Sequence, residues 1–102
     1  VKTAVSWNDK NIGKAIYFSR SLIPFGAEEF WHHVGIYGWK RKSLKRFVEM
    51  KVSDLERFEK LEQLRALESG IQIHTIITSE HPIGVDTKSD LKKAENYFKD
   101  LI

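Results

Sequence analysis

The chain has 102 residues, of which 41% are hydrophobic and 12% aromatic, so it has the size and composition of one small globular domain rather than of a disordered segment. Its formal net charge is only +3, from 17 Lys and Arg against 14 Asp and Glu, which does not by itself indicate a nucleic-acid partner. The absence of cysteine excludes a disulfide framework, a thiolate zinc site and a cysteine nucleophile, and no apolar run reaches the roughly 18 to 20 residues of a membrane span. We therefore expect a cytoplasmic protein that binds neither membrane nor nucleic acid.

The first 20 residues predict a β-hairpin. Residues Val1 to Ser6 alternate with a period of two, as in a strand, and Trp7 to Gly13 is rich in residues that form turns. A second strand follows over Lys14 to Arg20, and Arg20 ends one of its faces. Because the sequence starts directly in a strand pattern at Val1, without a methionine, we expect it to come from the interior of a longer protein.

A third strand is predicted over Phe30 to Trp39, and it contains two glycines, Gly35 and Gly38. A glycine within a strand often marks the close approach of another backbone or of a ligand, because it has no side chain to pack. His33 and Tyr37 are four residues apart and therefore share a face of a strand, with Gly35 between them. The gap could admit a ligand. Alternatively, His33 is a hydrogen-bonded imidazole of the interior.

The positive charge is concentrated in Trp39 to Arg46, WKRKSLKR, which overlaps a short amphipathic helix expected over Lys42 to Met50. Such a segment could bind phosphates or anionic substrates. Alternatively, it is the solvated start of a helix, and it lacks the interleaved aromatic side chains of a nucleic-acid platform. The residues expected to face inward from this helix are Leu44, Phe47 and Val48.

The longest run of helix-forming residues is Ser53 to Gly70, and it predicts one continuous helix. Ser53 and Glu56 have the spacing of a capping box, in which each side chain accepts a hydrogen bond from the backbone N–H of the other residue. Gly70 can adopt the left-handed backbone conformation that ends a helix. After it, the β-branched and apolar residues of Ile71 to Thr78 predict a buried strand.

One acidic residue, Glu62, interrupts the wide apolar stripe of this helix. The stripe consists of Leu55, Phe58, Leu61, Leu64, Ala66 and Leu67. Arg65, three residues further along, could form an intrahelical ion pair with Glu62. Alternatively, Glu62 faces a pocket, where it would accept hydrogen bonds from a ligand and where partial desolvation would raise its pKa. Gln63 falls on the polar side of the helix with Glu56 and Glu59, and its spacing gives it no particular role.

A loop is expected over 79–83, where Pro82 breaks the chain, and a final helix follows. Thr87 and Asp90 have the spacing of a weaker capping box for this helix. Asp86 precedes it, at a place where a negative charge stabilises a helix N-terminus by about 0.3 to 1 kcal/mol. The apolar stripe of the helix consists of Leu91, Ala94, Phe98 and Leu101.

Four segments of the sequence together resemble one family. They are YFSRS at Tyr17 to Ser21, HVGIYGW at His33 to Trp39, LEQLRALESG at Leu61 to Gly70 and GVDTKSDL at Gly84 to Leu91. In this order, and over essentially all 102 residues, the chain is similar to the C-terminal half of the 3-deoxy-D-manno-octulosonate (Kdo) cytidylyltransferases of Gram-negative lipopolysaccharide biosynthesis. The resemblance implies an α/β chain that forms the C-terminal half of a three-layer αβα fold like that of the nucleotide-sugar transferases, with a mixed sheet and an N-terminal hairpin.

The resemblance also implies a site. It assigns contacts with Kdo to Arg20, His33, Tyr37, Glu62 and Gln63, and the binding of Mg²⁺ to Asp86. The arginine would form a forked pair with the carboxylate of the sugar acid, and the other four side chains would hold its hydroxyls. In the family the anomeric hydroxyl of Kdo attacks the α-phosphate of CTP and pyrophosphate leaves, with Mg²⁺ bridging phosphate oxygens. No residue of this chain is assigned a catalytic role, and the family implies a homodimer.

By this resemblance residues 1–102 are the sugar-binding and dimerisation portion of a cytidylyltransferase, and the N-terminal nucleotide-binding portion is absent. We therefore expect the chain alone to be inactive. Two alternatives remain open. The chain could be a non-catalytic module for dimerisation or for binding a sugar acid. It could also belong to a cytidylyltransferase for another sugar acid, because groups that bind a carboxylate and hydroxyls do not identify the sugar.

Overall fold

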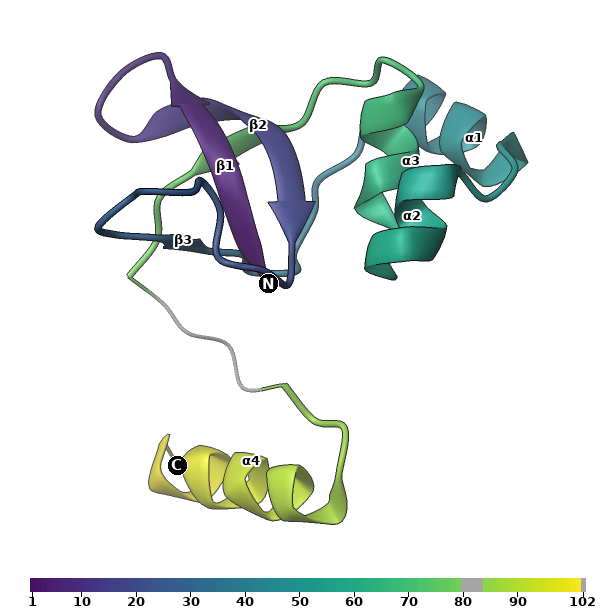
Figure 1. The fold of residues 1–102 in the computed structure, drawn as a ribbon. Coiled ribbons are helices and arrows are strands. Elements are labelled where there is room, and N and C mark those ends of the chain that lie inside the picture. The colour runs from purple at the N-terminus through teal and green to yellow at the C-terminus, as the bar shows by residue number, and fades with distance from the viewer. Residues whose placement is uncertain (80–83, 102) are drawn as a thin grey trace.

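Residues 1–79 and 84–101 are described by the computed structural model of this chain. Within them a sheet is accompanied by helices, an α/β arrangement as predicted (Figure 1). The elements are, in order, β1 (Lys2–Trp7), β2 (Ile12–Ser19), β3 (Trp31–His32), α1 (Arg41–Glu49), α2 (Asp54–Glu59), α3 (Gln63–Glu68), β4 (His74–Ile76) and α4 (Lys88–Leu101). Helices α1, α2 and α3 gather beside β2, whereas α4 lies apart from them in Figure 1.

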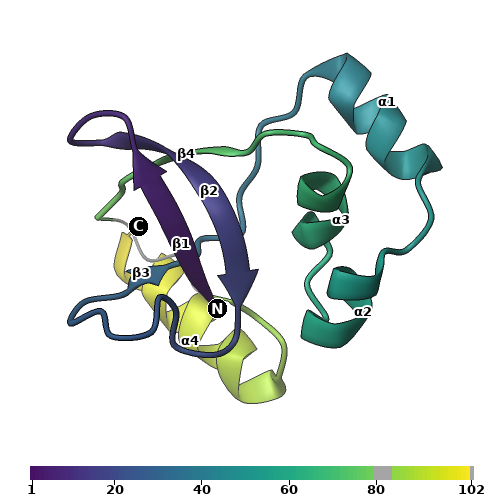
Figure 2. The ribbon, with the colours of Figure 1, turned by 45° about the horizontal axis from the view of Figure 1, so that its top comes forward.

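The predicted N-terminal hairpin is confirmed. β1 and β2 pair antiparallel, and in the turn between them Oδ1 of Asp9 accepts hydrogen bonds from the backbone N–H groups of Asn11 (2.8 Å) and Ile12 (2.9 Å). Bonds of this kind are the reason that Asp and Asn favour turns. The described strands lie in the order β3-β1-β2-β4 (Figure 2), and each pair is antiparallel, so the mixed sheet that we predicted is not found in this part of the chain.

The hydrophobic core lies between β2 and α3. Its buried residues are Ala15, Phe18, Leu61 and Leu64, and Val1, Tyr17, Leu55, Leu67 and Ile73 pack around them. Phe18 and Leu64 are the largest fully buried side chains, and burying a side chain of this kind contributes about 1.5 to 3 kcal/mol. The strand that leads into Arg20 and the helix that begins at Gln63 are therefore fixed against each other.

The prediction of one continuous helix over residues 53–70 is wrong, because the chain breaks at Lys60. Lys60 has a left-handed backbone (φ 57°) and closes α2 by donating its N–H to the carbonyl oxygen of Glu56 at 2.7 Å. The break lets Leu61 and Leu64 both face the sheet, at 7% and 0% exposure, while Phe58 is left 76% exposed. The break therefore lets Leu61 and α3 bury part of an apolar stripe that a single straight helix would spread around its circumference, and α2 itself has no buried residue.

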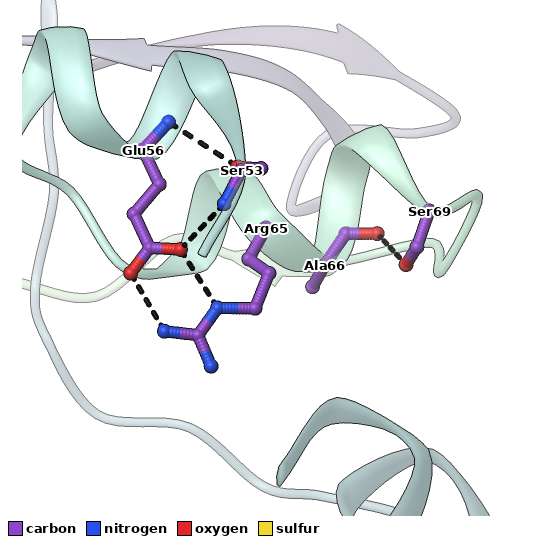
Figure 3. A network of polar contacts seen from close by, with 5 residues as sticks. All are labelled: Ser53, Glu56, Arg65, Ala66 and Ser69. Carbon is purple, nitrogen blue, oxygen red and sulfur yellow. Dashed lines mark hydrogen bonds and ion pairs between the residues drawn. The ribbon is translucent and has the colours of Figure 1, made fainter. Parts of the chain in front are cut away.

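The capping box that we predicted at the start of this segment is confirmed (Figure 3). The backbone N–H of Glu56 donates to the Ser53 hydroxyl, and the backbone N–H of Ser53 donates to Oε1 of Glu56, both at 3.3 Å. The same carboxylate accepts two hydrogen bonds of 2.7 Å from the Arg65 guanidinium, which lies 4.7 Å above the ring of Phe47. The bond from Arg65 lowers the pKa of Glu56. The ion pair thus joins α2 to α3, and the contact of Arg65 with Phe47 joins α3 to α1.

Two predicted strands are much shorter than expected. Of the strand predicted over Phe30 to Trp39 only Trp31–His32 pairs, because the glycine-containing segment after it has no neighbouring strand in the described part of the chain. Of Ile71 to Thr78 only His74–Ile76 pairs, and it does so at the edge of the sheet. Ile76 is 74% exposed, so the prediction of a buried strand is wrong.

The two remaining helices form where predicted, but their apolar faces are largely open. In α1 only Phe47 is buried, whereas Leu44 and Val48 are exposed, so the expectation that all three face inward is wrong. The capping box of Thr87 and Asp90 before α4 is confirmed. Along α4 Ala94 is buried and Leu91 and Phe98 are exposed. Pro82, residues 80–83 of the predicted loop and the side chain of Leu101 lie outside the described residues.

No helix in the described ranges is both long enough and apolar enough to cross a lipid bilayer.

Candidate functional site

A polar cluster forms where the sheet meets the start of the segment after β3. Lys2 of β1 pairs with Ser19 on one side and with His32 on the other. Arg20 follows Ser19 at the end of β2, and His33 follows His32 at the end of β3. These two residues therefore lie at the same end of the sheet. The backbone N–H of His33 continues this pairing by donating to the carbonyl oxygen of Val1 at 2.9 Å.

The His33 imidazole is hydrogen-bonded to the Tyr37 hydroxyl through Nε2. Its ring stands edge-on to the buried ring of Phe18, with 5.1 Å between the centroids. Burial lowers the pKa of His33, and burial together with the charge of Glu62 raises the pKa of Tyr37 to about 12. At neutral pH the phenol therefore keeps its proton and the imidazole is neutral, and one hydrogen bond joins the two groups. The hydrogen-bonded His33 that the sequence left as an alternative is present, and it is half-buried rather than enclosed.

Glu62 lies immediately before α3, with its carboxylate exposed. Its charge acts on the Tyr37 hydroxyl, which places the two groups near each other. The ion pair with Arg65 that we considered from the sequence does not form, because the Arg65 guanidinium is turned to Glu56. Within the described residues the Glu62 carboxylate is therefore left without an ion-pair partner, and its charge acts on both the Tyr37 hydroxyl and the Arg65 guanidinium.

Arg20 and Gln63 complete this cluster. Nη2 of Arg20 donates a hydrogen bond of 3.3 Å to the carbonyl oxygen of Lys60, in the break between α2 and α3. Gln63, the first residue of α3, is half-buried, and its Nε2 atom is buried without a hydrogen-bond partner in the described part of the chain. The structure thus brings the five side chains assigned to the sugar acid towards one junction, between the end of β2, the segment after β3 and the start of α3.

Asp86 is not part of this junction. It is exposed and precedes α4, and its backbone N–H donates to Oδ2 of Asp90 at 3.2 Å. No group of three or more His, Asp or Glu side chains in the ranges that the structure describes is arranged to hold a metal ion. Mg²⁺ is usually bound by one or two carboxylates together with phosphate oxygens. Asp86 fits the role of one such ligand, but it does not form a complete site.

Two further residues of the junction were missed by the sequence analysis, Tyr17 and Glu59. The pKa of Tyr17 is raised mainly by burial. The neighbouring Glu59 carboxylate raises it further, through its charge and its interaction with the hydroxyl. The Oε2 atom of Glu59 is buried and, among the described residues, has no partner. A continuous helix would place Glu59 on the solvated side, so only the break at Lys60 reveals its position.

We expect the free energy of unfolding to fall as the pH is lowered below 6.5. In the unfolded chain His33 binds a proton near its ordinary pKa of 6.5, whereas burial in the folded chain lowers that pKa. At pH values between 6.5 and the lower pKa of the folded chain, the unfolded state therefore binds more protons than the folded state. The free energy of unfolding decreases as the pH falls through this interval. Urea unfolding at several pH values should show this slope, and His33→Gln should flatten it. If the free energy of unfolding of His33→Gln depends on pH as steeply as that of the unaltered chain, a group other than His33 causes the pH dependence.

Comparison with known proteins bears on this junction. Residues 1–73 match a protein family described as Cytidylyltransferase. A protein of Rickettsia akari named 3-deoxy-manno-octulosonate cytidylyltransferase is 54% identical over 89 residues, which are 87% of this chain and 36% of that protein. A protein of the same name from Rickettsia rickettsii is also 54% identical, over 87% of this chain and 37% of its own length. The chain thus spans a little over a third of the length of these curated relatives.

Proposed function

This chain belongs to the cytidylyltransferase family, and we propose that it supplies the sugar-acid site of an enzyme that transfers CMP from CTP to Kdo for lipopolysaccharide biosynthesis. The observation that carries the proposal is the junction itself. The Glu62 carboxylate is left without an ion-pair partner in the described residues because Arg65 is paired elsewhere, and its charge acts on Tyr37, which is hydrogen-bonded to His33. The Kdo specificity is further supported by the names of the rickettsial relatives.

The junction offers groups suited to a hydroxylated carboxylic acid. Arg20 holds Lys60 through one nitrogen of its planar fork, and an arginine fork can also pair with a carboxylate. Glu62 can accept hydrogen bonds from sugar hydroxyls, and Tyr37 and Gln63 can each donate or accept one. In this account the side chains bind and orient the sugar acid so that its anomeric hydroxyl faces CTP. Positioning of this kind can lower a barrier by about 7 to 11 kcal/mol.

In this proposal the chain supplies only part of the binding site for Mg²⁺ and CTP. Asp86 would give Mg²⁺ one carboxylate ligand, and the ion when bound would supply positive charge that offsets the phosphates of CTP. We also propose that residues 1–102 are the C-terminal sugar-binding and dimerisation portion of a cytoplasmic, homodimeric enzyme with a three-layer αβα fold. Support for the dimer comes from apolar side chains that the described part of the chain leaves exposed, such as Leu91 and Phe98 of α4.

A chimera tests the proposed function. This chain would replace the matching segment of the R. akari relative, and pyrophosphate release would be measured with CTP, Kdo and Mg²⁺. We expect turnover by the chimera and none by the 102-residue chain alone, because this chain spans only 36% of the length of that relative. Sialic acid as acceptor distinguishes Kdo from other sugar acids. A folded chimera that is inactive with Kdo, or a chain that is active alone, would contradict the proposal.

A further inference from the structure

We infer that Glu59 is a positioning residue of the sugar-acid site, whose carboxylate bridges the Tyr17 hydroxyl and the Gln63 side-chain amide and so fixes which end of that amide faces the ligand. The inference rests on the proposed function for the identity of the ligand. The pairing itself concerns three side chains of this chain and can be tested without any ligand.

The first observation is a pair of complementary buried atoms. Oε2 of Glu59, an acceptor, and Nε2 of Gln63, a donor, are both buried, and neither has a partner in the part of the chain that the structure describes. Buried polar atoms in folded proteins are nearly always hydrogen-bonded. The two residues are four positions apart, the spacing at which side chains on a helix meet, although here the left-handed Lys60 lies between them. One atom is an acceptor and the other a donor, so a bond between them would satisfy both.

The second observation is the anchor of the Glu59 carboxylate. The Tyr17 side chain packs against the core formed by β2 and α3, and the Glu59 carboxylate beside it raises the pKa of its hydroxyl. A carboxylate accepts bonds on both oxygens, so one can hold the tyrosine while the other remains for the amide. Glu68 also places a negative charge near Tyr17, but neither of its oxygens is buried without a partner. Glu59 is therefore held by the sheet, not only by its own helix.

The consequence concerns the direction of hydrogen bonding at Gln63. An amide side chain has a donor end and an acceptor end, and it can rotate to exchange them. When Nε2 is bonded to Glu59, the oxygen Oε1 is the end that remains for the ligand. Gln63 then accepts from a hydroxyl of the sugar acid and disfavours a group in that place that has no proton to donate. Without Glu59 the amide is free to present either end.

The test in the active chimera is an exchange of the two side chains. Glu59→Gln should raise the KM for Kdo about tenfold and leave the KM for CTP unchanged, because the new amide can no longer reliably orient Gln63. The double variant Glu59→Gln/Gln63→Glu should recover most of that loss. In it the amide at position 59 can still accept from Tyr17 and can donate to the carboxylate at position 63, whose second oxygen still accepts from the ligand. The matched control Glu68→Gln should change neither KM.

Other results would overturn the inference. An unchanged KM in Glu59→Gln, or a double variant no better than the sum of its single variants, would mean that the two side chains are not paired. If Glu59→Gln unfolds, a folded and active double variant still supports the pairing, and an unfolded one makes Glu59 purely structural. If even the unaltered chimera is inactive, the side-chain amide resonances of Gln63 decide in the 102-residue chain. Glu59→Gln should shift them and Glu68→Gln should not, and unshifted resonances would end the inference independently of the proposed function.

Discussion

Replacing Glu62 with Ala in the chimera is expected to lower kcat/KM for Kdo by about 10- to 100-fold, because a hydrogen bond to a charged group is worth about 1.5 to 3 kcal/mol. The carboxylate is exposed and, in the described part of the chain, has no ion pair to lose. Its removal should therefore change the free energy of unfolding by no more than about 0.5 kcal/mol. Gln63→Ala should lower kcat/KM in the same direction. Initial rates of pyrophosphate release and urea unfolding give the two quantities.

The matched control for Glu62 is Glu49→Ala. Glu49 is also an exposed carboxylate at a helix end, but it lies in the last turn of α1 and contacts none of the five side chains of the junction. We expect its kinetics to equal those of the unaltered chimera. If Glu62→Ala unfolds the protein, or if its Kdo kinetics match those of Glu49→Ala, the role of Glu62 is structural or nil.

Replacing Arg65 with Ala is expected to destabilise the chain by about 3 kcal/mol, because removal of one partner leaves the other charge buried and unpaired. The side chains of Arg65 and Glu56 are only 16% and 13% exposed, and two hydrogen bonds of 2.7 Å join them. The substitution also removes the guanidinium that covers the ring of Phe47. Arg65→Lys keeps the charge but not the two-pronged geometry, so it should restore only part of the loss.

Arg57→Ala is the control for Arg65. Arg57 is paired with Asp54, three residues earlier in the same helix α2, but these side chains are 60% and 72% exposed, so the pair should contribute no more than about 1 kcal/mol. The pH dependence gives a second reading. Because Arg65 lowers the pKa of Glu56 from 4.5, the pair stabilises the fold above that pH and its contribution is lost as the pH falls through the folded value. Arg65→Ala should remove this acid-dependent part, and equal losses in Arg57→Ala and Arg65→Ala would contradict the account.

The features that the sequence predicts well are those decided by neighbouring residues. The hairpin follows from the turn chemistry around Asp9, and both capping boxes follow from the spacing of a hydroxyl and an acid, as at Ser53 and Glu56. The break at Lys60 has no such local signal, since neither glycine nor proline stands there. It is decided by the burial of Leu61 and Leu64 against β2, which depends on residues some forty positions away.

The same distinction applies to the site. The spacing of His33 and Tyr37 places them on one face of a strand, but four residues of extended chain would hold them about 13 Å apart. Their hydrogen bond depends on a bend after β3, where the N–H of Ile36 donates to the carbonyl oxygen of Val34. The choice between a pocket and an ion pair for Glu62 could not be made from periodicity, because Arg65 reaches Glu56 only after the helix breaks. Glu59 was placed on the solvated face for the same reason.

The account is tested most directly by titrating the isotopically labelled 102-residue chain with Kdo and following the amide and side-chain resonances by NMR. If the chain carries a sugar-acid site at this junction, the signals of Arg20, His33, Tyr37, Glu62 and Gln63 should move together and saturate, and gluconate should shift them far less. Shifts confined to the basic helix α1, or a folded chain whose spectrum does not respond to Kdo, would contradict it.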